Sequence, residues 1–269
     1  MYNPTIIPSL IALVVLSALA LLLVKRGHIR RRLALLLVIA PLLLGNIIWL
    51  QWIYPQQQRA AKIAAAQQQL ATTPAYRVIR QQQPTLYKQL NDELAAAVDN
   101  GMPTAEAIGQ LRPQLADLLN ERIGRAEDDN IIRYMQLSVS QMQNLRQQSG
   151  DLCFKFLFPQ ISGGVNTEQL LPKELQQQDL QQMEALLKAS SGADKPIDLT
   201  AARQSLRGIV RTLYAKWGGE LQLLNAPTDS HVDRDHMCDM TTDLYRAVLA
   251  LPPKQSANVL RMMLSSNAG

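Results

Sequence analysis

Histidine and cysteine are scarce in this chain, which has three histidines and two cysteines among 269 residues. Three of these five lie close together within residues 231–238, so no second cluster remains to complete a four-ligand zinc site. The sequence also lacks the G-x-S-x-G and H-E-x-x-H patterns, a phosphate-binding loop and a dinucleotide-binding fingerprint. We therefore predict no catalytic residue, no cofactor and no enzymatic activity.

Acidic residues are absent from residues 1–54, which contain two long uncharged apolar runs. The runs cover residues 5–24 and 33–53, and each has the length of about 20 residues that a helix needs to cross a bilayer. Trp49, Trp52 and Tyr54 gather at the end of the second run, as aromatic residues do at a membrane surface. The pattern predicts an N-terminal transmembrane hairpin.

A cleaved signal peptide is the alternative interpretation of the first run. Signal peptides begin with a positively charged leader. The first nine residues, MYNPTIIPS, include no lysine or arginine. Retention of both apolar runs as membrane helices is therefore favoured.

The loop between the two runs, residues 25–32, carries five positive charges: Lys25, Arg26, Arg30, Arg31 and Arg32. The other 22 basic residues balance the 22 acidic ones, so the net charge of +5 belongs to this loop, and nucleic-acid binding is not expected. Short basic loops stay in the cytoplasm, where they contact anionic lipid headgroups. We expect a bacterial inner-membrane protein whose two termini and soluble domain are periplasmic.

Residues 55–84 are rich in glutamine and alanine, and we predict a helical stalk or linker there. Residues 85–269 show helical periodicity almost throughout, which predicts an all-α soluble domain with a subdomain boundary near residues 190–198. In residues 127–150 the apolar side chains recur at helical spacing and predict a core helix. These are Ile131, Ile132, Met135, Val139, Met142 and Leu145.

A short segment, residues 151–164, departs from this helical pattern. Its three phenylalanines, Phe154, Phe156 and Phe158, are the only ones in the chain, and they alternate with other residues before Pro159. Alternation with a period of two is typical of extended backbone. We predict an extended or turn segment that fills the core, with a partner-docking site as the alternative.

Residues 198–217 form the clearest amphipathic pattern, with Asp198 expected to cap the helix. Its polar positions hold four basic residues: Arg203, Arg207, Arg211 and Lys216. A solvated face is the default interpretation of such residues. Contact with an acidic partner is the alternative.

The segment HVDRDHMCDM, residues 231–240, resembles a metal site at first sight. Ser230 and Asp233 match a capping box, however, and first-turn acids interact favourably with the helix dipole. His231 and His236 are five residues apart, about 140° around a helix, and do not converge on one ion. We favour an acid-rich helix start over a metal site formed by His231, Asp235 and His236.

The two cysteines, Cys153 and Cys238, are each other's only potential partners. In an oxidising compartment two cysteines in one folded domain usually pair. We predict a disulfide between them, with two buried free thiols as the alternative.

Three classes of function fit these features. The first is a membrane-anchored scaffold or binding module for another envelope protein. The second is an inner-membrane immunity or inhibitor protein that neutralises a toxin acting in the envelope. The third is an enzyme or metal-dependent sensor that uses residues 231–240. The expected partners are the lipid bilayer and an unidentified envelope protein, and self-association of the chain is a further alternative.

Overall fold

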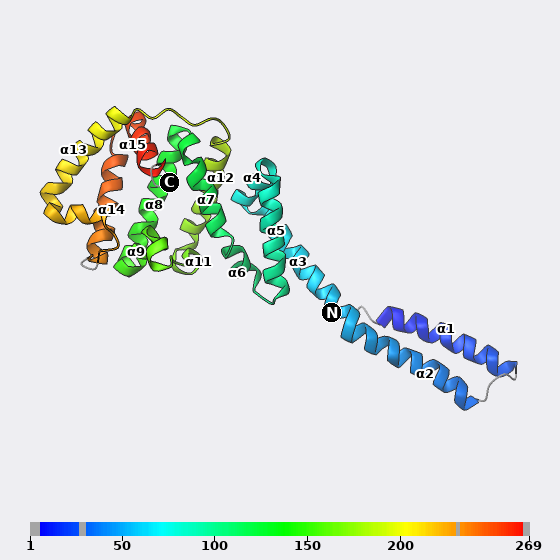
Figure 1. The fold of residues 1–269 in the computed structure, drawn as a ribbon. Coiled ribbons are helices and arrows are strands. Elements are labelled where there is room, and N and C mark those ends of the chain that lie inside the picture. The colour runs from blue at the N-terminus through cyan, green and yellow to red at the C-terminus, as the bar shows by residue number, and fades with distance from the viewer. Residues whose placement is uncertain (1–5, 27–30, 230–231, 266–269) are drawn as a thin grey trace. The chain divides into compact units, whose positions relative to one another are not determined.

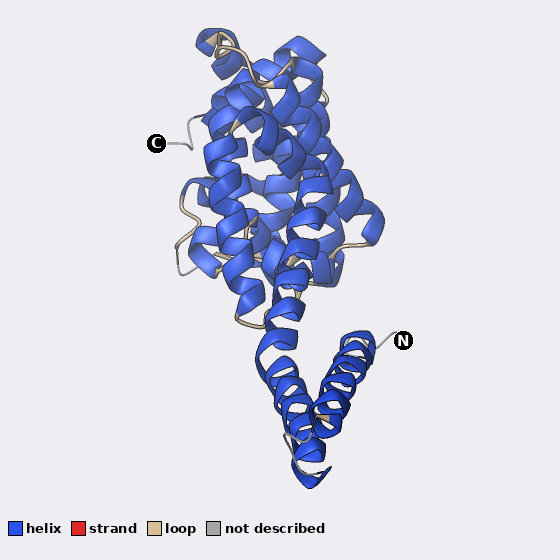
Figure 2. Ribbon diagram, turned by 90° about the vertical axis from the view of Figure 1, so that its right-hand side faces the viewer, coloured by secondary structure: helices blue, strands red, loops and turns tan. Residues whose placement is uncertain are grey.

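The computed structural model describes residues 6–26, 31–229 and 232–265. All regular secondary structure in these residues is helical, as predicted (Figure 2). The chain divides into two compact units, residues 1–65 and residues 66–269. Each unit is described separately.

The first unit contains two neighbouring helices, α1 (Ile6–Lys25) and α2 (Arg31–Ile48), which run antiparallel (Figure 1). A π-helical turn, η1 (Trp49–Ile53), continues α2 into α3 (Tyr54–Thr72). Among the described residues, one helical stretch, Leu35–Thr72, is long and apolar enough to cross a membrane. The apolar stretch of α1, Ser9–Lys25, is shorter than Leu35–Thr72.

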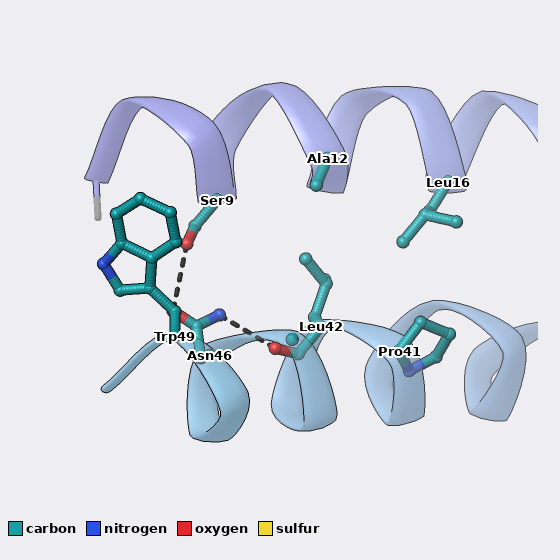
Figure 3. Close-up of a pocket in the computed structure, with 8 residues that line it drawn as sticks. Ser9, Ala12, Leu16, Pro41, Leu42, Asn46 and Trp49 are labelled. Atoms are coloured by element: carbon teal, nitrogen blue, oxygen red, sulfur yellow. Dashed lines mark hydrogen bonds between the residues drawn. The ribbon is translucent and has the colours of Figure 1, made fainter. Parts of the chain in front are cut away.

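A polar contact joins α1 to α2 inside their apolar interface (Figure 3). The Ser9 hydroxyl donates to Asn46 Oδ1 at 3.1 Å, and Asn46 Nδ2 donates to the Leu42 carbonyl at 2.8 Å. Ala12 and Gly45 line the small space beside this contact. The second bond lies within α2 and orients the Asn46 side chain, whereas the Ser9–Asn46 bond crosses between the helices and favours one register of α1 against α2.

The second unit is built around α8 (Asp128–Gln148), which contacts α9, α12, α14 and α15. The predicted core stripe of this helix is confirmed, since Ile131, Met135, Met142 and Leu145 are all buried. The helices before α8 are α4 (Pro74–Gln82), α5 (Pro84–Asp99), α6 (Thr104–Gly109) and α7 (Arg112–Arg122), followed by η2 (Ile123–Arg125). The later elements are α9 (Gly150–Leu157), α10 (Pro159–Ser162), α11 (Thr167–Leu170), α12 (Lys173–Ala189), α13 (Leu199–Trp217), η3 (Gly218–Asn225), α14 (Arg234–Leu249) and α15 (Pro253–Ser265).

The compact helical unit begins at Ala66, earlier than residue 85, where we predicted the end of the stalk. Leu70, Tyr76 and Ile79 are fully buried. α4 packs against α5 and α12, where Arg77 forms a 2.7 Å ion pair with Glu184. The second half of the predicted stalk therefore belongs to the core of this unit.

The extended conformation predicted for the phenylalanine-rich segment is wrong, because residues 150–157 form helix α9. The Ser149 side chain caps this helix by accepting a hydrogen bond from the Asp151 amide. Asp151 and Lys155 form an ion pair one turn apart, at 2.7 Å. These local interactions outweigh the β-propensity of the phenylalanines, and the helix ends before Pro159.

Candidate docking surface

Helix α13 lies at the edge of its unit (yellow in Figure 1) and is held at both ends by polar contacts. At its N-terminus Asp198 caps the helix as predicted, accepting from the Ala201 amide at 2.9 Å. Asn258 of α15 holds the same residue, since its side chain hydrogen-bonds the backbone amide and carbonyl of Asp198 at 2.9 and 2.8 Å.

The C-terminal end of α13 is attached to α14 through Asp243. The carboxylate of Asp243 accepts from Lys216 Nζ at 2.6 Å and from Trp217 Nε1 at 3.0 Å. The helix stops at Gly218, whose φ of +56° is strained for other residues. Polar contacts thus hold α13 to α15 at one end and to α14 at the other.

A recess of about 530 Å³ lies along the middle of α13, and we name it the α13 groove. One wall is formed by α13, and the rest of the lining comes mainly from η3 and α14. The lining side chains are largely apolar and include Leu206, Val210, Leu213, Tyr214, Leu244 and Tyr245. Apolar recesses with few polar groups are the usual form of binding sites in helical proteins.

Exposed apolar side chains in the second unit concentrate on α13. Of its described large hydrophobic residues, four are exposed: Ile161, Leu199, Val210 and Tyr214. Three of the four belong to α13, with exposed fractions of 47% for Leu199, 41% for Val210 and 56% for Tyr214. Val210 and Tyr214 also line the groove, and exposed apolar groups beside a recess make this face a candidate interaction surface.

Three arginines border this apolar surface. Arg203, Arg207 and Arg211 are exposed and, with Leu199, Val210 and Tyr214, occupy an arc of about 120° around the helix at 100° per residue. No residue of α13 is acidic, and no described carboxylate forms an ion pair with any of these arginines. Lys216, the fourth predicted basic residue, differs because Asp243 neutralises it.

The three phenylalanines of α9 and its C-terminal end have different environments. Phe154 is buried, and the Arg234 guanidinium stacks over its ring at 5.0 Å. Phe156 is partly buried against the core around the disulfide. Phe158 lines the α13 groove, so of the three residues predicted as partner contacts it is the one that reaches the candidate surface.

The acid-rich start of α14 is explained by contacts within the protein. Asp233 caps the helix by accepting from the amides of Asp235 and His236 at 2.8 and 3.1 Å, and these bonds lower the pKa of its carboxyl group. Ser230, which we predicted as the cap, lies outside the described residues. Arg146 makes two hydrogen bonds to the Asp239 carboxylate and an ion pair with Asp235 at 3.3 Å.

The alternative metal site would use His231, Asp235 and His236. His231 lies outside the described residues. Asp235 faces Arg146, whereas His236 Nδ1 lies 2.9 Å from Glu220 and its ring contacts Trp217. In the part of the chain that the structure describes, no group of three metal-ligating side chains is found.

A disulfide joins Cys153 of α9 to Cys238 of α14, as predicted. Both residues are fully buried, in a cluster with Met142, Leu145 and Leu171. The bond holds the start of α14 against α9 and α8. It therefore fixes one end of α14, which lines part of the α13 groove.

The predicted lipid-contact residues lie where α1 ends and α2 begins. Lys25 is the last residue of α1, and Arg31 is the first residue of α2. The side chains of Lys25, Arg26 and Arg32 are exposed, whereas Arg30 lies outside the described residues.

Sequence reasoning missed the α13 groove. Val210 and Leu199 belong to the apolar stripe of residues 198–217, and a stripe of this kind predicts burial. The stripe is wider than the face that packs on α14 and α15, where Ala202, Ile209 and Leu213 are buried. The extra width of the apolar stripe was the signal in the sequence for an uncovered surface on α13.

Comparisons with protein-family models, curated proteins and solved structures gave no match.

Proposed function

We propose that this chain is a membrane-anchored docking protein of the bacterial envelope, which binds another protein through the α13 groove and catalyses no reaction. The concentration of exposed apolar side chains on α13, beside a recess of about 530 Å³, supports the docking role. Helix-in-groove binding is a common mode of recognition for such surfaces.

The proposed anchor is a transmembrane hairpin of α1 and α2. Leu35–Thr72 has the length and composition of a spanning helix, and residues 5–24 form an uncharged run of similar character. The basic loop between them favours a cytoplasmic position under the positive-inside rule. The helical unit is then periplasmic, where the disulfide is stable.

Introducing two aspartates on the groove side of α13 should abolish docking. We expect a stoichiometric partner to co-purify with the wild-type chain after mild crosslinking, and Val210→Asp/Tyr214→Asp to lose it, because carboxylates replace apolar groups on the contact surface. The matched control is Thr212→Asp/Ala215→Asp, which adds the same charges to exposed positions on the other side of α13. Equal recovery of the partner with both variants would contradict the proposal.

The proposed topology is tested with single introduced cysteines, since the native pair is closed. We expect a membrane-impermeant maleimide to label Lys254→Cys in intact spheroplasts, because Lys254 is exposed at the start of α15. Gly27→Cys, in the basic loop, should react only after lysis. The reverse labelling pattern would place the helical unit in the cytoplasm.

A further inference from the structure

The charge on α13 restricts the kind of partner that fits the groove. Arg203, Arg207 and Arg211 recur every four residues along the exposed apolar edge, and no described carboxylate pairs with them. Some other arginines of the unit are paired with carboxylates, as Arg77 is with Glu184 and Arg146 is with Asp239. The groove edge is thus a local excess of positive charge beside an apolar recess.

From this arrangement we propose that the α13 groove binds an amphipathic helix of a different protein, with apolar side chains on one face and carboxylates along the adjoining edge. This inference rests on the docking function proposed above. Apolar side chains spaced at i, i+3, i+4 and i+7 would enter the recess beside Val210 and Tyr214. Carboxylates one turn apart would meet the three arginines, which can form bidentate hydrogen bonds with them.

A protein helix fits this site better than a lipid surface does. A bilayer is flat and takes up apolar side chains that project from an amphipathic helix. Here Val210 and Tyr214 border a recess, and Leu206 and Leu213 lie inside it. A recess is filled by projecting side chains of a partner, and charge complementarity at its edge selects partners with acidic residues.

Site-specific photocrosslinking of the full chain in its own cells tests the inference. The probe is p-benzoylphenylalanine, introduced as Tyr214→p-benzoylphenylalanine at the groove edge. Thr212→p-benzoylphenylalanine, exposed on the opposite side of the same helix, is the control. We expect a protein adduct at Tyr214 and not at Thr212, and we expect mass spectrometry to place it in a segment with acidic amphipathic periodicity.

Charge variants of the Tyr214 probe protein examine the role of the arginines. Arg203→Glu/Arg207→Glu/Arg211→Glu should lower the adduct yield about tenfold or more, because three attractive contacts become repulsive. Arg203→Lys/Arg207→Lys/Arg211→Lys keeps the charge and should retain most of the adduct. Circular dichroism of both variants should match the wild type, since all three side chains are exposed.

The outcomes separate the two proposals. An adduct whose segment lacks acidic residues, or whose yield is unchanged by the three glutamates, overturns the partner chemistry but leaves docking at the groove intact. An adduct with lipid or with a second copy of this chain overturns it as well. If Tyr214 gives no more adduct than Thr212, both this inference and the docking function at α13 are wrong.

Discussion

Loss of the Cys153–Cys238 disulfide is expected to lower the free energy of unfolding of the helical unit by about 4 to 5 kcal/mol. The two cysteines are 85 positions apart, and closing a loop of this length removes that much chain entropy from the unfolded state. The variant to use is Cys153→Ala/Cys238→Ala, because serine would bury unpaired hydroxyl groups at these two fully buried positions. Urea unfolding of the full chain in mild detergent, followed by circular dichroism, measures the change.

A reductant provides the control for this experiment. It should move the unfolding midpoint of the wild type close to that of the double variant and leave the variant unchanged. If the wild type and the variant unfold at the same urea concentration under oxidising conditions, the disulfide does not stabilise the unit.

Gly150→Ala should destabilise the unit by about 1 to 3 kcal/mol, the usual cost of overpacking a filled interior. Gly150 begins α9 where this helix meets the start of α14. A Cβ atom at this position would lie only 2.9 Å from Asp235 Cα, so the backbone of α14 would have to move. Thermal unfolding of the full chain in detergent measures the loss.

Gly208→Ala on α13 is the matched substitution, and we expect it to stabilise the unit instead of destabilising it. A Cβ at Gly208 meets no atom within 4 Å, and alanine is favoured over glycine in a helix interior by about 1 kcal/mol. The two variants make the same chemical change, so a difference in sign isolates the close approach at Gly150. Equal shifts for both variants would mean that α9 and α14 do not meet as described.

Helical periodicity was sufficient to predict the all-helical character of the described residues and the core of α8, because both depend on where apolar residues recur along one helix. It failed at residues 150–157, where the alternating phenylalanines suggested extended backbone. Two short-range contacts, the Ser149 cap and the Asp151–Lys155 pair, favour a helix there. Such contacts involve single side chains and leave little trace in the hydrophobic pattern.

The end of the stalk was misplaced for a different reason. Around Leu70, glutamine and alanine dominate the sequence, and no apolar stripe is visible. Leu70 of α3 and Ile79 of α4 are nevertheless buried, and α4 packs against α5 and α12, which come later in the chain. Burial that depends on a partner distant in sequence cannot be inferred from the local composition.

The disulfide was predictable by elimination, since the chain has only two cysteines. The α13 groove was not, because it is defined by what α14 and α15 leave uncovered. Helical spacing gives the positions of Val210 and Tyr214 around the axis of α13. It does not give how much of the surface of α13 is covered by the neighbouring helices. Only the tertiary arrangement separates the buried part of the stripe from the open part.

The attachment of α13 at both ends has a consequence for the rate of the proposed partner binding. Asn258 holds one end and Asp243 the other, so the surface offered to a partner is ordered before any encounter. Association then requires no ordering of α13, and its entropy cost falls mainly on the incoming segment. Differences in affinity among partners should therefore appear in how long each complex survives rather than in how quickly it forms.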